Sequence, residues 1–457
     1  MKLVLLSGGS GKRLWPLSND ARSKQFLKVL ENNNGKLQSM VQRVWAQLDN
    51  VNLTESAVIA TSNSQVDMIQ SQISQDVPLI IEPMRRDTFP AIALASVFLY
   101  SVQKINLSEV VVVLPVDPYV QDNFFKRVKI LENCLVHSDA HIALMGVKPT
   151  YPSEKYGYIV PSTEHSKNEF LKVSHFTEKP SKEKAKELIK HGALWNCGVF
   201  AFKLEYIITL LQEKGLPIEY GELLEQYNNL PKISFDYEVV EKSDNIVVLP
   251  YNGYWKDLGT WNTLTEEMAT NQIGKGVITS SQNTHLINEL DIPVTVLGVP
   301  NAVVAASPDG ILVADKASSP KIKELVCGFN QRPMYEERRW GWYRVLDHTR
   351  FEDGREVLTK RIGVTAGKNL SYQMHRHRSE VWTIIKGEGD FALNGQIQRV
   401  KPGDVLEIKV GEEHGIKAIT DLEFIEVQSG SELVEEDIVR IFLTWEEIEE
   451  HCYSLQN

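Results

Sequence analysis

The chain has 457 residues, of which 42% are hydrophobic and 24% are charged, a composition typical of a globular protein with two or three domains of about 150 residues each. Its 49 Lys and Arg against 60 Asp and Glu leave a net charge of −11, which argues against a protein that coats nucleic acid or an anionic membrane. The first apolar run is too short for a signal peptide, no apolar stretch is long enough to span a membrane, and the four widely spaced cysteines favour free thiols in the cytoplasm.

Short apolar runs alternate with helical patterns over the first 260 residues. The runs, each typical of a strand buried on both faces, are residues 3–6, 57–60, 79–81, 110–114 and 142–147. Helical spacing is clearest over residues 37–48 and 90–103. This alternation predicts an α/β fold with a Rossmann-like, mostly parallel sheet, in which ligands bind beyond the carboxyl ends of the strands.

The pattern changes twice along the rest of the chain. We expect a transferase domain over residues 1–268, a small β-rich connector over 269–332, and a second β-rich domain over 333–457. Regular glycines separate short strands in the last segment, which favours a barrel or jelly roll. Residues 434–451 are acidic with helical spacing, and we expect them to form a helix that caps the barrel.

A glycine-rich loop with basic residues, Ser7 to Arg13, follows the first apolar run directly. Such a loop suits phosphate binding, because glycines let backbone N–H groups approach closely. Two well-known phosphate motifs fail here. A P-loop would need glycine at Leu6 and Ser or Thr at Arg13, and the dinucleotide fingerprint would need glycine at Leu14. By itself the loop also fits a tight turn with solvated basic residues.

The loop continues as Gly-Lys-Arg-Leu-Trp-Pro-Leu-Ser over residues 11–18, which resembles the signature of nucleoside-diphosphate-sugar pyrophosphorylases, in the form of the mannose-1-phosphate guanylyltransferase branch. Further segments resemble that family in its own order: residues 24–27, 82–94, 114–118, 176–180, 195–200, 235–238 and 255–261. Asp87, Phe89 and Pro118 depart from the family pattern, and they leave open another nucleotide or another sugar 1-phosphate.

The resemblance implies that GTP and mannose 1-phosphate form GDP-mannose and pyrophosphate. It implies catalytic roles for Arg13, Lys24 and Asp117, and a Mg²⁺ ion held by Asp117 and Asp257. The implied nucleotide contacts are Leu6, Gly8, Gly9, Gly11, Lys12, Glu82, Arg86 and Thr88, and the implied sugar contacts are Gly157, Glu178, Lys179, Asn196 and Asp236. The alternatives are that Asp117 caps a helix, that Asp257 belongs to a turn, and that Glu178 and Lys179 are a surface pair.

A second dense cluster runs from Gln373 to Trp382. Positions 373, 375 and 377 would share one face of a strand, because side chains alternate with a period of two. Residues 363–415 resemble the two-part cupin signature, which implies that a divalent metal, with Zn²⁺ as a candidate, is bound by Gln373, His375, Glu380 and His414. His377 would then lie in the pocket as a non-ligand.

The same segment resembles the mannose-6-phosphate isomerase part of bifunctional guanylyltransferase–isomerases. This implies mannose 6-phosphate as a further substrate, with Arg376 or Arg378 as the candidate partner of its phosphate. The alternative is a cupin that serves only for metal binding or oligomerisation. We also expect the protein to form a homo-oligomer, specifically a dimer.

Overall fold

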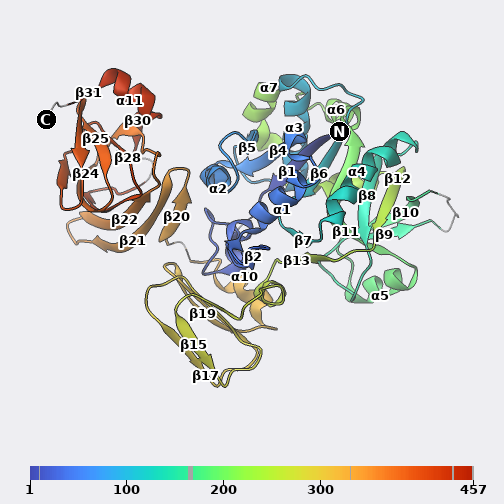
Figure 1. Cartoon of the computed structure of the whole chain (residues 1–457). Helices are drawn as coiled ribbons and strands as arrows, with labels where there is room; N and C mark the ends of the chain where they lie inside the picture. The colour runs from blue at the N-terminus through green and yellow to red at the C-terminus, as the bar shows by residue number, and fades with distance from the viewer. Residues whose placement is uncertain (10, 163–167, 330, 435–436, 455–457) are drawn as a thin grey trace.

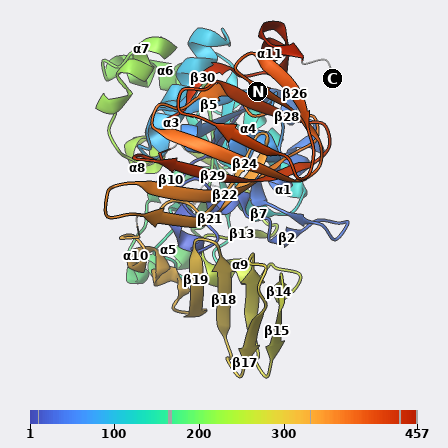
Figure 2. The same ribbon diagram turned by 90° about the vertical axis from the view of Figure 1, so that its left-hand side faces the viewer.

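The computed structural model describes residues 1–9, 11–162, 168–329, 331–434 and 437–454. These residues form an α/β part, a small β part below it and a β barrel beside it (Figure 1). Seen from the side, the barrel lies in front of the α/β part, and the small β part lies below both (Figure 2). No helix in the described ranges has the length and apolar character needed to cross a membrane.

The α/β part is built on a nine-stranded sheet in the order β5-β4-β1-β6-β11-β8-β12-β10-β9. Five strands confirm the five apolar runs: β1 (Lys2–Ser7), β4 (Ala57–Ser62), β5 (Leu79–Glu82), β6 (Val110–Pro115) and β8 (Ile142–Val147). The others are β9 (Tyr158–Pro161), β10 (Leu171–Thr177), β11 (Leu194–Lys203) and β12 (Ile246–Tyr251).

The sheet is less parallel than expected. Strands β5, β4, β1 and β6 are parallel, and so are β8 and β12. Strand β11 lies between these groups and pairs antiparallel with both β6 and β8, and β10 and β9 add antiparallel pairs at the edge. An apolar strand buried on both faces has the same residue pattern in either direction, so direction depends on the connections.

Helices cover both faces of this sheet and bury two apolar cores. They are α1 (Met40–Asp49), α2 (Val66–Gln72), α3 (Thr88–Val97), α4 (Asn123–Val136), α5 (Lys182–Lys190), α6 (Leu204–Glu213), α7 (Tyr220–Glu225) and α8 (Phe235–Glu238). Helix α9 (Trp261–Thr265) packs instead in a separate core that the α/β part shares with the connector. Helix α1 begins later than expected because Ser39 caps it with a reciprocal bond to Gln42. Helix α3 spans the first part of the predicted helix 90–103, which continues as the π-helix η5 (Phe98–Val102).

Short elements complete the α/β part and the connector. The α/β part also has β2 (Leu30–Glu31), β3 (Leu37–Gln38), β7 (Pro118–Val120) and β13 (Trp255–Asp257). The connector has β14 (Gln272–Ile273), β15 (Gly276–Thr279), β16 (His285–Asn288), β17 (Val294–Leu297), β18 (Ala302–Ser307), β19 (Gly310–Asp315) and α10 (Ile322–Leu325). The connector strands pair mainly in parallel and alternate between two sheets. Two hydrogen bonds of 2.9 Å from Arg22 to the Glu289 carboxylate join the connector to the α/β part.

The C-terminal barrel consists of two six-stranded sheets packed around Trp382, Phe391 and Phe424. One contains β20 (Tyr335–Arg338), β21 (Gly341–Arg350), β22 (Glu356–Val364), β24 (Arg378–Lys386), β27 (Val405–Ile408) and β29 (Leu422–Gly430). The other contains β23 (Tyr372–Met374), β25 (Gly389–Leu393), β26 (Gln396–Val400), β28 (His414–Ala418), β30 (Val439–Phe442) and β31 (Tyr453–Ser454).

The predicted helix over 434–451 is wrong in its first half. Residues 439–442 form β30, which pairs with β23, and only α11 (Trp445–His451) is helical after a capping box at Thr444. Residues 435–436 lie outside the described part of the chain. Helix α11 does cover the barrel, because Trp445 and Ile448 pack on Tyr372 and Ile397.

Candidate functional site

Two aspartates that are 140 positions apart in the chain converge on one lysine. Strands β7 and β13 pair so that Asp257 lies opposite Pro118, the residue after Asp117. The Lys24 ammonium lies 2.8 Å from Asp117 Oδ2 and 2.9 Å from Asp257 Oδ1. Lys24 begins the 3-10 helix η2 (Lys24–Phe26), so the short segment after the glycine loop positions it. The site thus holds a cation between two carboxylates.

The charges in this group stabilise one another. Burial by itself lowers the pKa of Lys24, but the two aspartates outweigh it and the pKa is raised. Burial raises the pKa of Asp257, yet the charges of Lys24 and Arg13 outweigh this effect, and the pKa is lowered. Lys24 and Asp257 are therefore both charged at neutral pH.

The glycine loop borders a cavity of about 240 Å³ beside this group. The residues that line it are Gly8, Gly9, Gly11, Arg13, Ser23, Lys24 and Gln25. Glycine is required at position 11, because a Cβ there would lie 1.8 Å from the carbonyl oxygen of Asn19. Arg13 is exposed at the cavity. Ser10 lies outside the described residues.

Two predicted nucleotide contacts lie apart from this cavity lining. Lys12 belongs to the 3-10 helix η1 (Gly11–Leu14), and its Nζ lies 4.0 Å from Asp20 Oδ2. Leu6 is half-buried in β1, and its carbonyl oxygen accepts a hydrogen bond from the backbone N–H of Val116.

A buried polar network that the sequence did not reveal holds the loop in place. Gln65 Nε2 donates to Ser23 Oγ at 2.7 Å, and Ser23 Oγ donates to the carbonyl oxygen of Gly9 at 3.2 Å. Gln25 Nε2 donates to Gln65 Oε1 at 3.3 Å. The network connects the loop to the residue before α2. Single buried glutamines carry no sequence signal of such a role.

The other three predicted nucleotide contacts hold the segment from Tyr227 to the first residue of α8, Phe235. Glu82 accepts a hydrogen bond of 2.7 Å from the hydroxyl of Tyr227, and Arg86 donates to the carbonyl oxygen of Leu230 at 2.7 Å. Thr88 Oγ1 accepts from the backbone N–H of Phe235 at 2.8 Å. Burial raises the pKa of Glu82 and is partly offset by the Tyr227 hydrogen bond.

The five predicted sugar contacts come together from four segments. Asn196 Nδ2 donates to Asp236 Oδ1 at 2.6 Å, and Lys179 Nζ lies 2.6 Å from Glu178 Oε1. Gly157 lies directly beside them, since a Cβ there would approach Glu178 Oε2 to 2.5 Å. A bulge in β11 between Asn196 and Phe200 aims the Asn196 amide at this group.

The electrostatics of the sugar-side cluster are unusual. Burial and the neighbouring carboxylate of Glu178 raise the pKa of Asp236 to about 7. Burial also raises the pKa of Glu178, which its hydrogen bond with Lys179 partly offsets. The cluster thus concentrates carboxylates and an amide that can pair with hydroxyl groups.

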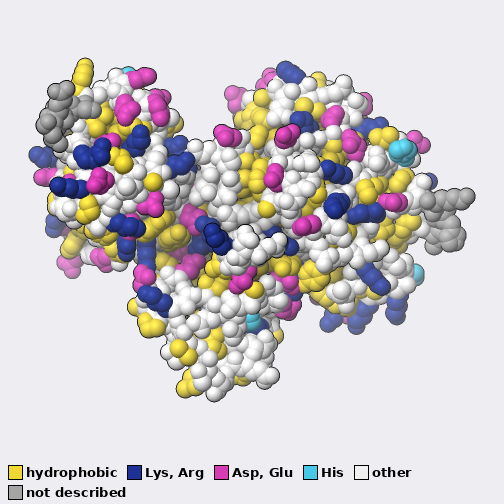
Figure 3. All heavy atoms as spheres, viewed as in Figure 1, with side chains coloured by type: hydrophobic (Ala, Val, Ile, Leu, Met, Phe, Trp, Pro, Cys, Tyr) yellow, Lys and Arg dark blue, Asp and Glu magenta, His cyan; other side chains and the backbone are white. Residues whose placement is uncertain are grey.

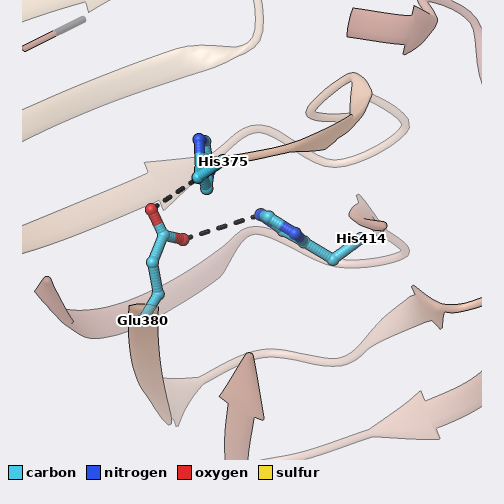
Figure 4. A group of neighbouring side chains, drawn as sticks. All are labelled: His375, Glu380 and His414. Atoms are coloured by element: carbon cyan, nitrogen blue, oxygen red, sulfur yellow. Dashed lines mark ion pairs between the residues drawn. The ribbon is translucent and has the colours of Figure 1, made fainter. Parts of the chain in front are cut away.

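In the barrel, His375, Glu380 and His414 form a buried group (Figure 4). His375 Nε2 lies 3.2 Å from Glu380 Oε1, and His414 Nε2 lies 3.6 Å from Glu380 Oε2. Their candidate ligand atoms all lie within 4.8 Å of one another. Nε2 of His414 is buried and makes no hydrogen bond to any described residue, as expected of an atom that binds a metal. The donor set fits a divalent metal.

Surrounding backbone carbonyl groups and side chains orient these three residues. Nδ1 of His375 bonds the carbonyl oxygen of Asp437 and Nδ1 of His414 bonds that of Glu412, so both Nε2 atoms face inward. Trp382 and Gln428 donate to Glu380 at 3.1 Å each. Burial lowers the pKa of both histidines, which favours the neutral imidazole that metals bind.

Gln373, the fourth predicted ligand, also reaches the group, with Nε2 3.4 Å from His375 Nε2. His377 does not lie in the pocket as expected: β23 ends at Met374, the strand alternation stops there, and the side chain is exposed. Arg376 is exposed as well, while Arg378 is buried and donates to Glu380 at 2.9 Å. Sequence reasoning missed Asp437, whose carboxylate accepts both backbone N–H groups of 376 and 377.

Comparisons with known proteins agree with both halves of this picture. A model of the nucleotidyl transferase family matches residues 2–273, and a model of the mannose-6-phosphate isomerase C-terminal domain matches residues 330–442. Among curated relatives, the mannose-1-phosphate guanylyltransferase RfbM of Salmonella typhimurium is 30% identical, and the alignment covers 96% of each chain. The alginate biosynthesis protein AlgA of Pseudomonas syringae pv. tomato is 30% identical over 96% of this chain and 95% of its own.

A solved structure supports the fold of the transferase part. The crystal structure of a mannose-1-phosphate geranyltransferase from Thermus thermophilus aligns with a TM-score of 0.60 and 28% identity, over 72% of this chain and 99% of that one. Family model, relatives and structure all point the same way, and this chain belongs to the mannose-1-phosphate guanylyltransferase family.

Proposed function

We propose that the protein joins mannose 1-phosphate to the α-phosphate of GTP, releasing pyrophosphate and forming GDP-mannose. We assign this reaction to residues 1–268, and the isomerisation of mannose 6-phosphate and fructose 6-phosphate to residues 333–457. The observation that carries the first assignment is the convergence of Lys24, Asp117 and Asp257 beside the glycine-loop cavity, in a chain of this family.

The reaction brings a phosphate monoester anion to a triphosphate, so neutralising charge and positioning the two groups dominate the barrier. Arg13 and Lys24, at the cavity, face the phosphates and stabilise the charge that develops on them. The loop glycines Gly8, Gly9 and Gly11 let backbone N–H groups approach the phosphates. No covalent intermediate with the protein is needed.

Asp117 and Asp257 would hold Mg²⁺, because two carboxylates that converge on one cation are ligands of the type that this ion prefers. When bound, Mg²⁺ supplies further neutralisation of the phosphate charge. Lys24 pairs with Oδ2 of Asp117 and Oδ1 of Asp257, so the other oxygen of each carboxylate would be left for the ion.

The sugar-side cluster recognises mannose 1-phosphate. Glu178, Asn196 and Asp236 pair with its hydroxyls and Lys179 faces its phosphate, while Gly157 leaves room for the Glu178 carboxylate. On the nucleotide side, Glu82, Arg86 and Thr88 define the boundary toward the base together with Leu6, and Lys12 extends the positive charge of the loop.

In the barrel, Gln373, His375, Glu380 and His414 would hold a divalent metal, with Zn²⁺ our first candidate. When bound, such a metal polarises the carbonyl group of an open-chain sugar. The buried chain residues around it keep the histidines neutral and exclude bulk water. The alternative to an isomerase is a barrel that serves only for metal binding or oligomerisation.

The first test measures pyrophosphate release from GTP with mannose 1-phosphate, using the purified full chain and Mg²⁺. We expect turnover, with GTP and mannose 1-phosphate preferred over ATP, UTP, CTP and other hexose 1-phosphates. A preference for another pair would identify another pyrophosphorylase. No turnover with any pair would contradict the proposal.

The second test follows the conversion of fructose 6-phosphate to mannose 6-phosphate by the full chain loaded with Zn²⁺, Co²⁺ or Mn²⁺ in turn. We expect conversion with at least one metal and none after chelation. Metal binding without conversion under any of these conditions would favour the purely structural barrel.

A further inference from the structure

A cavity of about 450 Å³ lies between the barrel and the transferase domain. Gln373, Arg378 and Trp382 line it from the barrel. Gln373 contacts His375, and Arg378 and Trp382 both donate to Glu380, so the cavity adjoins the candidate metal group. The opposite wall belongs to the transferase domain: Asn63, Val66, Asp67 and Gln70, in and before α2. Figure 1 shows α2 at the edge of the α/β part that faces the barrel, and Figure 3 shows the surface hollowed between the two parts.

The α2 wall is held in place by polar contacts across the boundary. Arg338 of β20 lies 3.1 Å from Asp67 of α2. Glu337, which is buried, accepts from Gln72 Nε2 at 3.3 Å and from Lys28 Nζ at 3.1 Å. Buried charge-assisted hydrogen bonds of this kind fix relative position. The cavity is therefore a feature of the assembled chain and not of the barrel alone.

The cavity lining carries two arginines that no acid neutralises within the described ranges, Arg339 and Arg440. The other two guanidinium groups at the cavity are occupied, Arg338 by Asp67 and Arg378 by Glu380. Arg440 pairs in register with Gln373 across β30 and β23, so its side chain stands on the same face as that candidate ligand. A free guanidinium beside a polar cavity suits a phosphate group.

We infer that the isomerase pocket is shared between the two domains, and this inference rests on the isomerase function proposed above. A hexose 6-phosphate lies in the cavity with its carbonyl end toward His375, Glu380 and His414. Its phosphate binds Arg339 and Arg440, and α2 of the transferase domain forms the wall behind the sugar. The volume of about 450 Å³ falls in the range of sites for small ligands. The sequence offered Arg376 and Arg378 as partners of this phosphate, but Arg376 is exposed and Arg378 is paired with Glu380.

The arginines are tested with Arg339→Gln and Arg440→Gln in the metal-loaded full chain. We expect each to raise the KM for mannose 6-phosphate by about tenfold to a hundredfold, the effect of losing a charged hydrogen bond. Weak binding of unphosphorylated mannose, measured by calorimetry, should not change. Arg355→Gln, in the exposed turn between β21 and β22, is the matched control. Unchanged KM values in both cavity variants would overturn the assignment of the phosphate.

The shared wall is tested from the other domain with Gln70→Trp, which places a large side chain in the cavity. We expect the KM for mannose 6-phosphate to rise at least tenfold while pyrophosphate release from GTP stays within twofold, which also shows that the chain folds. Gln212→Trp, exposed on α6, is the matched control. An isomerase that responds equally to both variants, or to neither, would overturn the shared wall.

Calorimetric titration with mannose 6-phosphate separates this inference from the function beneath it. Binding that the arginine and Gln70 variants weaken, without turnover in the parent chain, would uphold the shared pocket and overturn the isomerase. Turnover in the parent chain, with binding that the arginine and Gln70 variants leave unchanged, would uphold the isomerase and overturn the shared pocket. Neither binding nor turnover would overturn both.

Discussion

At the scale of single residues, the transferase site depends on charges that are useful only together. Lys24 neutralises two carboxylates that would otherwise repel each other, and these carboxylates in turn keep the lysine charged despite its burial. Lys24 itself lines the cavity beside the glycine loop. Removing one member therefore changes the position and the charge of the others.

We expect Lys24→Met to lower kcat/KM for GDP-mannose formation by about a hundredfold, as is typical when one preorganised charge is lost. Pyrophosphate release at saturating Mg²⁺ measures this. Lys28→Met is the matched control, because Lys28 lies four residues away and binds Glu337 instead. A Lys24→Met enzyme within threefold of the parent would contradict the role of the lysine.

Asp236 links pH to stability. Its pKa is raised to about 7 in the folded chain, so between about pH 4 and 7 the folded state binds more protons than the unfolded state. The free energy of unfolding should therefore fall as the pH rises through this window. Asp236→Asn keeps an oxygen that accepts from Asn196 and should make the profile flatter. Urea unfolding at pH 5 and pH 8 measures the difference, and equal slopes in both proteins would contradict the prediction.

At the scale of elements, strand ends and irregularities place the functional groups. The short pair β7–β13 brings Asp257 to Asp117, and the bulge in β11 turns Asn196 toward Asp236. Both devices join segments that are far apart in the chain. Where β9 begins, Gly157 packs against Glu178 and the ring of Phe176.

We expect Gly157→Ala to raise the KM for mannose 1-phosphate about tenfold or more, because the new methyl group would displace Glu178 from a distance of 2.5 Å. The KM for GTP should change much less. Gly221→Ala is the matched control: this glycine lies in helix α7, with only one atom as near as 4.0 Å, and alanine favours the helix. Equal KM values in the Gly157 variant and the parent would show that Glu178 does not bind the sugar.

At the scale of the whole molecule, the proposed magnesium site at Asp117 and Asp257 and the candidate metal group at His375, Glu380 and His414 lie in separate parts of the chain. Because the two sites share no residue, a substitution that disables one site should leave the activity of the other unchanged. We expect His414→Ala to abolish isomerisation and to remove the rise in Tm that a divalent metal causes in the parent chain. GDP-mannose formation with Mg²⁺ should persist. A variant that loses both activities while keeping its Tm would show that the domains do not work independently.

The sequence by itself determined the five buried strands and the position of the glycine loop, because these features depend on residue type and short spacing. The sugar-side residues and the barrel ligands were indicated by the resemblance to known families and not by periodicity, because their members lie far apart in the chain. The helix expected over 434–451 failed because the pairing of β30 with β23 outweighed helical spacing.

Only the tertiary structure decided what depends on contacts between distant segments. The antiparallel direction of β11, the network from Gln65 to Gly9, the exposure of His377 and the wall that α2 adds to the barrel cavity all belong to this class. No local pattern encodes them, because each contact joins residues whose sequence neighbourhoods are independent. Folding brings them together, and their chemistry depends on that proximity.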